Sequence, residues 1–488
     1  MSRKLCSLVI SAVCLSTHGV FATDEDANKS PKNRTSFESR ILTLTDVVLQ
    51  KHIDPPTRQQ MILAGTKALY QADKRQIPKG LSQRVSDLAK PEQFEEFLKD
   101  IQTEFGALRN TEVILTQGLL SSLPCGAHLV DAETNMVQGQ LAANRYVGIG
   151  IALTMNKKEN FPAIPTVIYN GPAWRAGVKP GDMILKVNGQ TMQSKNLVHA
   201  VQHLRGEEGS EVTIEVRQPG SQKSRKLKMT RGRVFIPTVE GTRKISEGEW
   251  QYKLGSADDI AYVRIKNIGS STLHELRQVE AKLRDQNMKG IILDLRGGGS
   301  VLHDTIMVAD SLLDGGVIGQ IQSLDSLKKH EARPGALFQN IPMVVLVGKQ
   351  TSPGSVFLTA ALQDNHRAIV IGEPTSGQTY VRSNVPLPYR HDHILMATAL
   401  MQRGDGTTLL VPRFRSPRLP KINVGKTTQP IKRPGFIMPD HSVVPRQRAV
   451  NRSKGSTNSP ILAKATEVLR SMQSQIPSQS KDKQNPGS

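Results

Sequence analysis

The chain has 488 residues, of which 38 % are hydrophobic and 4 % aromatic, and its formal net charge at pH 7 is +21. A chain of this length has room for two or three domains that each bury a core. No apolar run reaches the roughly 20 residues that a membrane-spanning helix needs. The composition therefore indicates a globular protein with polar ends and argues against a membrane protein built of helices.

The first residues have the pattern of a secretory signal peptide. Arg3 and Lys4 precede the apolar run LCSLVISAVCL, and the small-residue sequence VFA precedes Thr23. A charged region, a short apolar region and a small-residue cleavage site predict removal of residues 1–22. The mature protein is expected to be secreted, periplasmic or otherwise extracytoplasmic, with no transmembrane segment. A buried first helix is the alternative interpretation.

Residues 37–139 are expected to form an N-terminal helical region. Apolar residues recur at helical spacing in LTLTDVVLQKHI, RQQMILAGTKALYQA and PEQFEEFLKDIQTEF. Pro55 and Pro56 separate the first two helices. The mature chain would keep Cys125 as its one cysteine, because Cys6 and Cys14 lie in the signal peptide. A single thiol forms no intrachain disulfide and is a poor metal site, so we expect no metal and no cofactor.

The rest of the chain divides by the spacing of its apolar residues. Residues 140–233 alternate apolar and polar positions between Gly and Pro, which predicts a β-rich domain. In residues 234–445 the runs IAYVRI, GIILDL, MVVLV and AIVIGE alternate with helical stretches, so the fold class is α/β with layered sheet and helices. Residues 446–488 are expected to hold a C-terminal helix and a disordered tail.

Positive charge gathers in two stretches. The run KSRKLKMTRGR covers Lys223 to Arg233, and residues 403–454 hold twelve Lys or Arg against two acids. Such stretches can meet nucleic acid or an anionic surface. They lack interleaved aromatic residues, and no nucleic-acid-binding signature occurs. Solvated basic faces are therefore the favoured interpretation, and no nucleic-acid partner is expected.

The sequence YVGIGIAL, followed by VIYNGPAWRAGVKPGDMILKVNGQ, resembles a PDZ domain of the type found in bacterial proteases. The resemblance implies that backbone N–H groups of a loop hold a peptide's terminal carboxylate while a strand edge pairs with the peptide. That loop would consist of Tyr146, Val147, Gly148, Ile149 and Gly150. A tight bend alone would explain GIG but not the whole pattern. Protein or peptide C-termini are the expected partners, and the oligomeric state is left open.

Two later stretches, GIILDLRGGGSVLHDTIMVADSLLDGG and VVLVGKQTSPGSVFLTAALQDNHRAIVIGEPTSGQTYV, resemble the core of the C-terminal processing peptidases, the tail-specific serine proteases. The segments GTKAL, GFIMPD and SPILAKATEVL also match, so the resemblance covers about residues 37–471. It implies a protein whose PDZ domain captures a substrate's C-terminus and whose Ser/Lys dyad cuts nearby.

The dyad positions depart from the family pattern. Aligning VVLV and ALQD without gaps puts the family's nucleophilic serine at Pro353, its lysine at Gln378, and a further polar position at Arg382. A serine hydroxyl needs a base to become a nucleophile, and a lysine serves when its neutral form is accessible. Proline has no hydroxyl and glutamine cannot accept the proton. In this alignment the usual mechanism cannot operate.

Ser352 and Ser355, in TSPGS, are the fallback candidates for a nucleophile. Ser352 precedes a proline expected at the first helical position, which predicts that it caps the helix. Ser355 would lie just inside the helix and could face the cleft. Its most obvious base, His366, lies eleven residues further on, roughly 16 Å along a helix. His303 is interpreted as structural.

The glycine-rich turn in DLRGGGS follows a buried strand, where the family supplies an oxyanion-hole N–H. Gly298 or Gly299 would be the equivalent, and without a nucleophile the same group could bind a peptide carbonyl. Two functions therefore stay open. One is a secreted serine peptidase homologue with an altered catalytic constellation, and the other is a catalytically inactive scaffold or adaptor that binds peptide C-termini.

Overall fold

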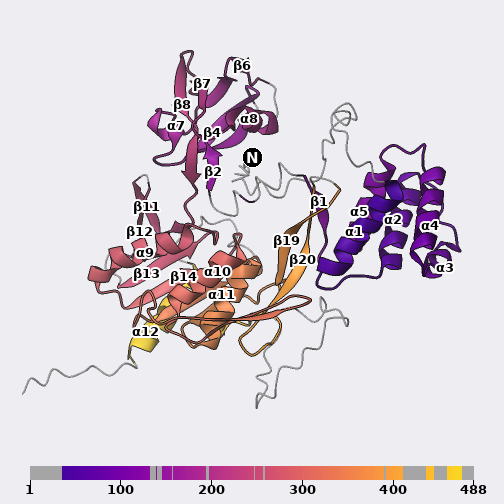
Figure 1. Cartoon of the computed structure of the whole chain (residues 1–488). Coiled ribbons are helices and arrows are strands. Elements are labelled where there is room, and N and C mark those ends of the chain that lie inside the picture. Colours follow the sequence, from indigo (N-terminus) through magenta and orange to yellow (C-terminus); the bar gives the residue numbers. More distant parts are fainter. Residues whose placement is uncertain are drawn as a thin grey trace, which may run out of the picture. The chain divides into compact units, whose positions relative to one another are not determined.

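The computed structural model describes residues 36–131, 139, 145–156, 158–193, 197–246, 248–255, 259–389, 392–409, 436–443 and 459–474. The chain forms two compact units (Figure 1). The described residues of the smaller unit fall in 140–237 and 246–249, and those of the larger unit in 33–139, 238–245 and 250–488. The predicted signal peptide and most of the basic stretch 403–454 lie outside the described residues.

Five helices begin the larger unit: α1 (Phe37–Lys51), α2 (Arg58–Ala72), α3 (Leu81–Ser86), α4 (Pro91–Glu104) and α5 (Thr111–Ser121). α1 starts where the Ser36 side chain accepts a hydrogen bond from the amide of Ser39, and α2 starts with a capping box between Thr57 and Gln60. Their apolar faces share one core. The helical pattern predicted for this region is confirmed.

The central sheet of the larger unit has the strand order β10-β13-β14-β17-β18-β21. Its strands are β10 (Val239–Glu240), β13 (Ile260–Ile265), β14 (Gly290–Asp294), β17 (Met343–Val347), β18 (Ile369–Gly372) and β21 (His441–Ser442). The strands from β13 to β21 are parallel, and β10 is antiparallel to β13. The α/β core predicted from the apolar runs is confirmed.

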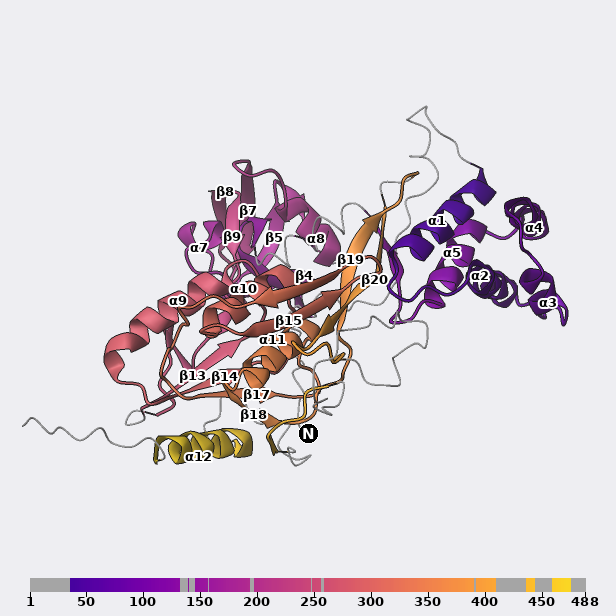
Figure 2. The same cartoon turned by 60° about the horizontal axis from the view of Figure 1, so that its bottom comes forward.

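Helices cover both faces of this sheet (Figure 2). They are α9 (Thr272–Leu283), α10 (Leu302–Leu312) and α11 (Pro353–Asp364) on one face and α12 (Pro460–Ser474) on the other. Ile291 and Leu293 of β14 pack in the first core, and Ile292 packs against the α12 side. Strands buried on both faces need continuous apolar sequence, which is why GIILDL and MVVLV were recognisable.

A second sheet of the larger unit joins distant parts of the chain. It contains β1 (His128–Val130), β15 (Val317–Gln322), β16 (Leu327–Glu331), β19 (Tyr380–Pro386) and β20 (His393–Gln402). β1 comes from the region predicted to be helical and pairs with β20, while Ile394 and Met396 of β20 pack against the N-terminal helices. A three-residue strand is too short to give a periodic signal.

The smaller unit is the predicted β-rich domain. Its sheet has the order β3-β4-β5-β7-β8, with β6 paired to β5, and β2 pairs separately with β9. The elements are β2 (Arg145–Gly148), β3 (Ile151–Asn156), β4 (Phe161–Val167), α7 (Pro172–Arg175), β5 (Met183–Val187), β6 (Gln190–Thr191), α8 (Leu197–Leu204), β7 (Glu211–Arg217), β8 (Ser224–Thr230) and β9 (Gly232–Phe235). β3 is therefore an edge strand of its sheet. The short strands β11 (Arg243–Ser246) and β12 (Glu249–Gln251) follow.

Candidate functional site

The serines of TSPGS lie where β17 ends and α11 begins. Ser352 is the N-cap of α11, and its Oγ accepts a hydrogen bond of 3.4 Å from the amide of Ser355. Pro353 follows at the start of the helix, where its missing N–H costs nothing. The predicted cap is confirmed. Ser355 is only 3 % exposed and packs inside the first turn.

A third hydroxyl, that of Ser300, joins this corner. Ser352 Oγ lies 3.0 Å from Ser355 Oγ and 3.2 Å from Ser300 Oγ, and the amide of Gly354 donates to Ser300 Oγ at 2.9 Å. Ser300 follows β14, which is the parallel neighbour of β17, so the carboxyl ends of the two strands bring these serines together. The sequence had not singled out Ser300, although its place directly after the glycine-rich turn in DLRGGGS was an available signal.

Neither candidate base lies beside these hydroxyls. α11 runs unbroken from Pro353 to Asp364, so His366 lies beyond the opposite end of a 12-residue helix, about 18 Å long at 1.5 Å per residue. His303 projects into solvent from the first turn of α10. Within the described ranges, no hydrogen bond joins either histidine to the serine hydroxyls.

The other two positions aligned with the family's polar residues lie near β19. Gln378 precedes the strand and its side chain is exposed. Arg382, within the strand, is exposed too, and its guanidinium donates a hydrogen bond to the backbone carbonyl of Cys125. Neither side chain supplies a neutral amine that could serve as a general base.

In the glycine turn after β14, the amides of the two oxyanion candidates, Gly298 and Gly299, differ in whether they already have a hydrogen-bond acceptor. Gly298 has φ +83°, and a Cβ there would lie 1.5 Å from the backbone oxygen of Lys266, so the turn needs glycine. The amide of Gly299 donates to the side-chain oxygen of Asn267 at 2.8 Å. The amide of Gly298 has no acceptor among the residues that the structure describes. Of the two, Gly298 alone keeps a donor for a ligand.

A buried carboxylate holds the start of this turn. Asp294, which is fully buried, accepts hydrogen bonds from the Arg296 guanidinium at 2.9 and 2.7 Å, from the Arg296 amide at 3.0 Å and from the Tyr262 hydroxyl at 2.7 Å. Burial by itself would raise the pKa of Asp294, but the hydrogen bonds and charge of Arg296 outweigh it and hold that pKa below its usual range. The carboxylate therefore stays ionised and fixes the strand end.

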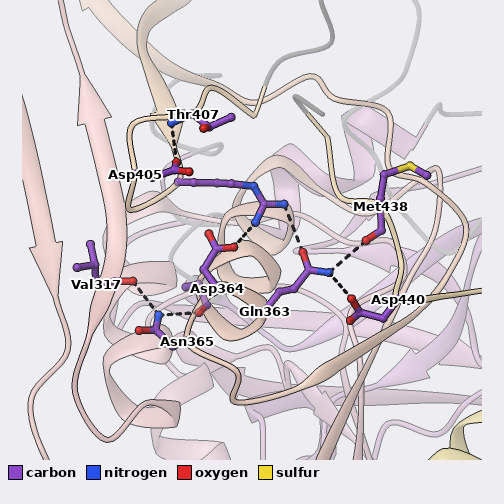
Figure 3. A network of polar contacts seen from close by, with 10 residues as sticks. Val317, Gln363, Asp364, Asn365, Asp405, Thr407, Met438 and Asp440 are labelled. Atoms are coloured by element: carbon purple, nitrogen blue, oxygen red, sulfur yellow. Dashed lines mark hydrogen bonds and ion pairs between the residues drawn. The ribbon is translucent and has the colours of Figure 1, made fainter. Parts of the chain in front are cut away.

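The opposite end of α11 is held by a polar network (Figure 3). Arg403, which is 2 % exposed, forms an ion pair with Asp364 and donates to Gln363 Oε1. Gln363 in turn donates to Asp440 and to the carbonyl of Met438. The interpretation of residues 403–454 as a solvated basic face is wrong for Arg403, because its charge is needed to pair a carboxylate inside the protein.

The second basic run, residues 223–233, is also largely paired. Arg225, Lys228 and Arg233 form ion pairs with Asp182, Glu211 and Glu208. Arg231 is 6 % exposed and donates to the carbonyls of Leu204, Glu211 and His203. Arg225 and Arg231 are therefore held within the smaller unit, whereas Lys223, Lys226, Lys228 and Arg233 are exposed, as expected for a solvated basic face.

The predicted peptide-binding loop starts in a strand and ends in a turn. Tyr146, Val147 and Gly148 belong to β2 and pair with β9. Ile149 and Gly150 then turn into the edge strand β3: the carbonyl of Ile149 accepts from Ala173, and that of Gly150, with φ +83°, accepts from Ile168. The first residue of β3, Ile151, was not among the predicted loop residues, although its backbone lies at the same turn.

The surroundings of the edge strand are apolar. Ile151 of β3 and Leu197 and Val201 of α8 are partly buried and pack against the core of the smaller unit. An edge strand offers unpaired backbone groups to an added strand. Together the turn, the edge and these side chains make the arrangement that β-augmentation requires.

The described residues contain no group of three or more His, Cys, Asp or Glu that could hold a metal ion. Cys125 is a free thiol that hydrogen-bonds with Tyr380, and burial raises its pKa, which makes it a weak nucleophile. None of the helices in the described ranges has the length and apolar character to cross a membrane.

Two segments of the chain match known protein families. Residues 259–411 match peptidase family S41, and residues 164–218 match the PDZ domain. A carboxy-terminal-processing protease of Bartonella bacilliformis is 26 % identical over 326 residues, which cover 65 % of this chain and 71 % of that protein. The chloroplastic carboxyl-terminal-processing peptidase 2 of Arabidopsis thaliana is 29 % identical over 277 residues, which cover 55 % of this chain and 50 % of that protein. Among solved structures, a photosystem II D1 C-terminal processing protease aligns with 84 % of this chain and 93 % of its own, at 20 % identity and a TM-score of 0.43.

Proposed function

Because the chain belongs to the family of C-terminal processing peptidases that carry a PDZ domain, we propose that it captures peptide C-termini through that domain and hydrolyses them very slowly or not at all. The observation that carries the proposal is the start of α11, where proline occupies the aligned position of the nucleophile and the neighbouring serines bond to one another.

Peptide capture is supported by the geometry of the smaller unit. A peptide added antiparallel to β3 would bring its terminal carboxylate to the turn of Ile149 and Gly150, where backbone N–H groups can hold it. Its last side chain would meet the apolar surface of Ile151, Leu197 and Val201. The expected ligand is a peptide with a free carboxylate and an apolar last residue.

Loss of hydrolysis is supported by the chemistry of the corner. The amides of Gly354 and Ser355 are already bonded to serine hydroxyls, and Pro353, Gln378 and Arg382 occupy the aligned family positions. Loss of a positioned general base alone typically removes about 10²–10⁴-fold in rate, and loss of the nucleophile removes the covalent route.

Export from the cytoplasm is part of the proposal and depends on residues 1–22. The mature protein is expected to begin near Thr23. N-terminal sequencing of the protein from a fractionated cell tests this: a cytosolic protein that retains residues 1–22 would contradict it.

A serine peptidase with an altered constellation is the second candidate. It is favoured by the hydrogen bonds that link Ser352 to Ser355 and to Ser300, the residue that follows the glycine turn, and by the amide of Gly298, which has no acceptor among the described residues and is left to meet an oxyanion. In this alternative one of the two hydroxyls attacks the peptide carbonyl.

One set of assays separates the two. Purified mature protein is incubated with unfolded proteins that have apolar C-termini, beside Ser355→Ala and Ser352→Ala. We expect no cleavage above background in all three; cleavage that Ser355→Ala or Ser352→Ala abolishes would establish the peptidase.

Binding is measured with a fluorescein-labelled decapeptide ending in three valines, as the free acid and as the C-terminal amide. Tighter binding of the acid is expected, and equal binding would reject the proposed mode.

A further inference from the structure

The hydroxyl of Tyr146 already occupies the turn that would hold a peptide carboxylate. The ring lies against Gly148, where a Cβ would come within 2.8 Å of Tyr146 Cε2. From this position the phenolic oxygen lies within reach of the backbone N–H groups of Gly150 and Ile151, whose influence opposes the effect of burial on the pKa of Tyr146. These two N–H groups stand where the turn enters the edge strand β3.

We propose that Tyr146 closes the carboxylate site of the ligand-free protein and that a peptide C-terminus binds by displacing its hydroxyl. The inference rests on the proposed function and adds how that site is regulated. It also gives Gly148 a role, because any larger residue there would push the ring away from the two amides.

The exchange has a physical basis. An internal acceptor satisfies these backbone N–H groups while the site is empty, and each such hydrogen bond adds a modest net stabilisation. Burial raises the pKa of Tyr146 to about 12, so the phenol is neutral at physiological pH. A carboxylate accepts hydrogen bonds roughly twice as strong as a neutral oxygen does. A free C-terminus can therefore replace the hydroxyl, whereas an amide or an internal peptide carbonyl gains little by doing so.

The test compares Tyr146→Phe with the wild type in the full mature chain. The ring and its contact with Gly148 are kept, and only the competing oxygen is removed. The Kd of the decapeptide ending in three valines should fall roughly 2- to 12-fold, the effect of one net hydrogen bond. The ratio of the Kd of the amide peptide to the Kd of the acid peptide should become smaller, because the amide peptide no longer has to displace the phenol oxygen.

Tyr169→Phe is the matched control. Tyr169 is in the same unit, is 48 % exposed and packs its ring against Trp174, and its hydroxyl forms no hydrogen bond with the described loop residues 146–150. This variant should bind both peptides as the wild type does. Far-UV circular dichroism establishes that each variant is folded.

Amide hydrogen exchange provides the second readout, independent of peptide. In Tyr146→Phe the amides of Gly150 and Ile151 should exchange faster than in the wild type and in Tyr169→Phe. Unchanged exchange, or weaker binding of the acid peptide by Tyr146→Phe, overturns the inference while leaving the proposed function intact. Equal binding of acid and amide by the wild type overturns both.

Discussion

The predicted peptide-binding loop of the smaller unit (residues 146–150) and the corner of the larger unit where β17 ends and α11 begins (residues 352–355) use the same chemistry with different consequences. Each presents backbone N–H groups suited to a negative charge, and each already satisfies two of them with side-chain hydroxyls. At the loop the acceptor is the phenol of Tyr146. At the corner the acceptors are the hydroxyls of Ser300 and Ser352.

The two sets of acceptors differ in what holds them. Tyr146 is only partly buried and lies beside an open strand edge. Ser352 is 7 % exposed, lies beside Pro353 and bonds to two other hydroxyls, and Ser300 follows a turn held by a buried ion pair. We infer that the loop can exchange its acceptor for a ligand, whereas the corner cannot do so without moving packed groups.

The largest expected change in the free energy of unfolding comes from breaking the ion pair between Asp294 and Arg296, which holds the start of the glycine turn. Asp294→Asn should lower the free energy of unfolding by about 2–4 kcal/mol, since it leaves Arg296 without its buried partner, although the 35 % exposure of the arginine moderates the loss. Asp310→Asn is the control, because the partner Arg333 is 77 % exposed and such a pair contributes at most about 1 kcal/mol. Urea unfolding measures both.

The pH dependence adds a second signature of Asp294. Its pKa in the folded protein lies below the ordinary value of about 3.9, so its stabilising effect is complete above that value and is lost as the pH falls through the folded pKa. The difference in stability between wild type and Asp294→Asn should be constant near neutral pH and shrink below about pH 4. A difference that grows on acidification would contradict the assignment.

The glycine turn gives an intermediate effect. Gly298→Ala should destabilise the protein by about 1–3 kcal/mol more than Gly297→Ala. Both residues have positive φ, but only at position 298 would the new Cβ meet the backbone oxygen of Lys266, while the space at position 297 is open. Thermal unfolding of the two variants gives the difference, and equal melting temperatures would show that the close approach is not maintained in solution.

The smallest effects compare the two acceptors directly. Ser352→Ala should cost about 0.5–2 kcal/mol as a lost N-cap. Tyr146→Phe should cost less, because water can reach the uncovered amides at the open edge. Urea unfolding measures both losses. If Tyr146→Phe loses more unfolding free energy than Ser352→Ala, the hydroxyl of Tyr146 is held more tightly than that of Ser352, and the proposed difference between the two sites is wrong.

Local sequence was sufficient for three of the N-terminal helices and for the buried parallel strands. Helical spacing marked α1, α2 and α4, and continuous apolar runs marked the buried parallel strands, since both signals arise within one element. The Ser-Pro pair predicted the cap at Ser352 because capping depends on the neighbouring residues alone.

Other features arose only when distant segments met. Ser300 reaches the amide of Gly354, 54 positions away, because β14 and β17 are adjacent in the sheet. Arg403 is buried because folding brings it to Asp364, 39 positions earlier in the chain. The two strand ends, and the arginine with its carboxylate, are separated by intervening elements, so their partners are set by strand order and packing. No periodic pattern in the sequence reflects these contacts, which is why the sequence predicted the cap at Ser352 but not the contact of Ser300 with the start of α11.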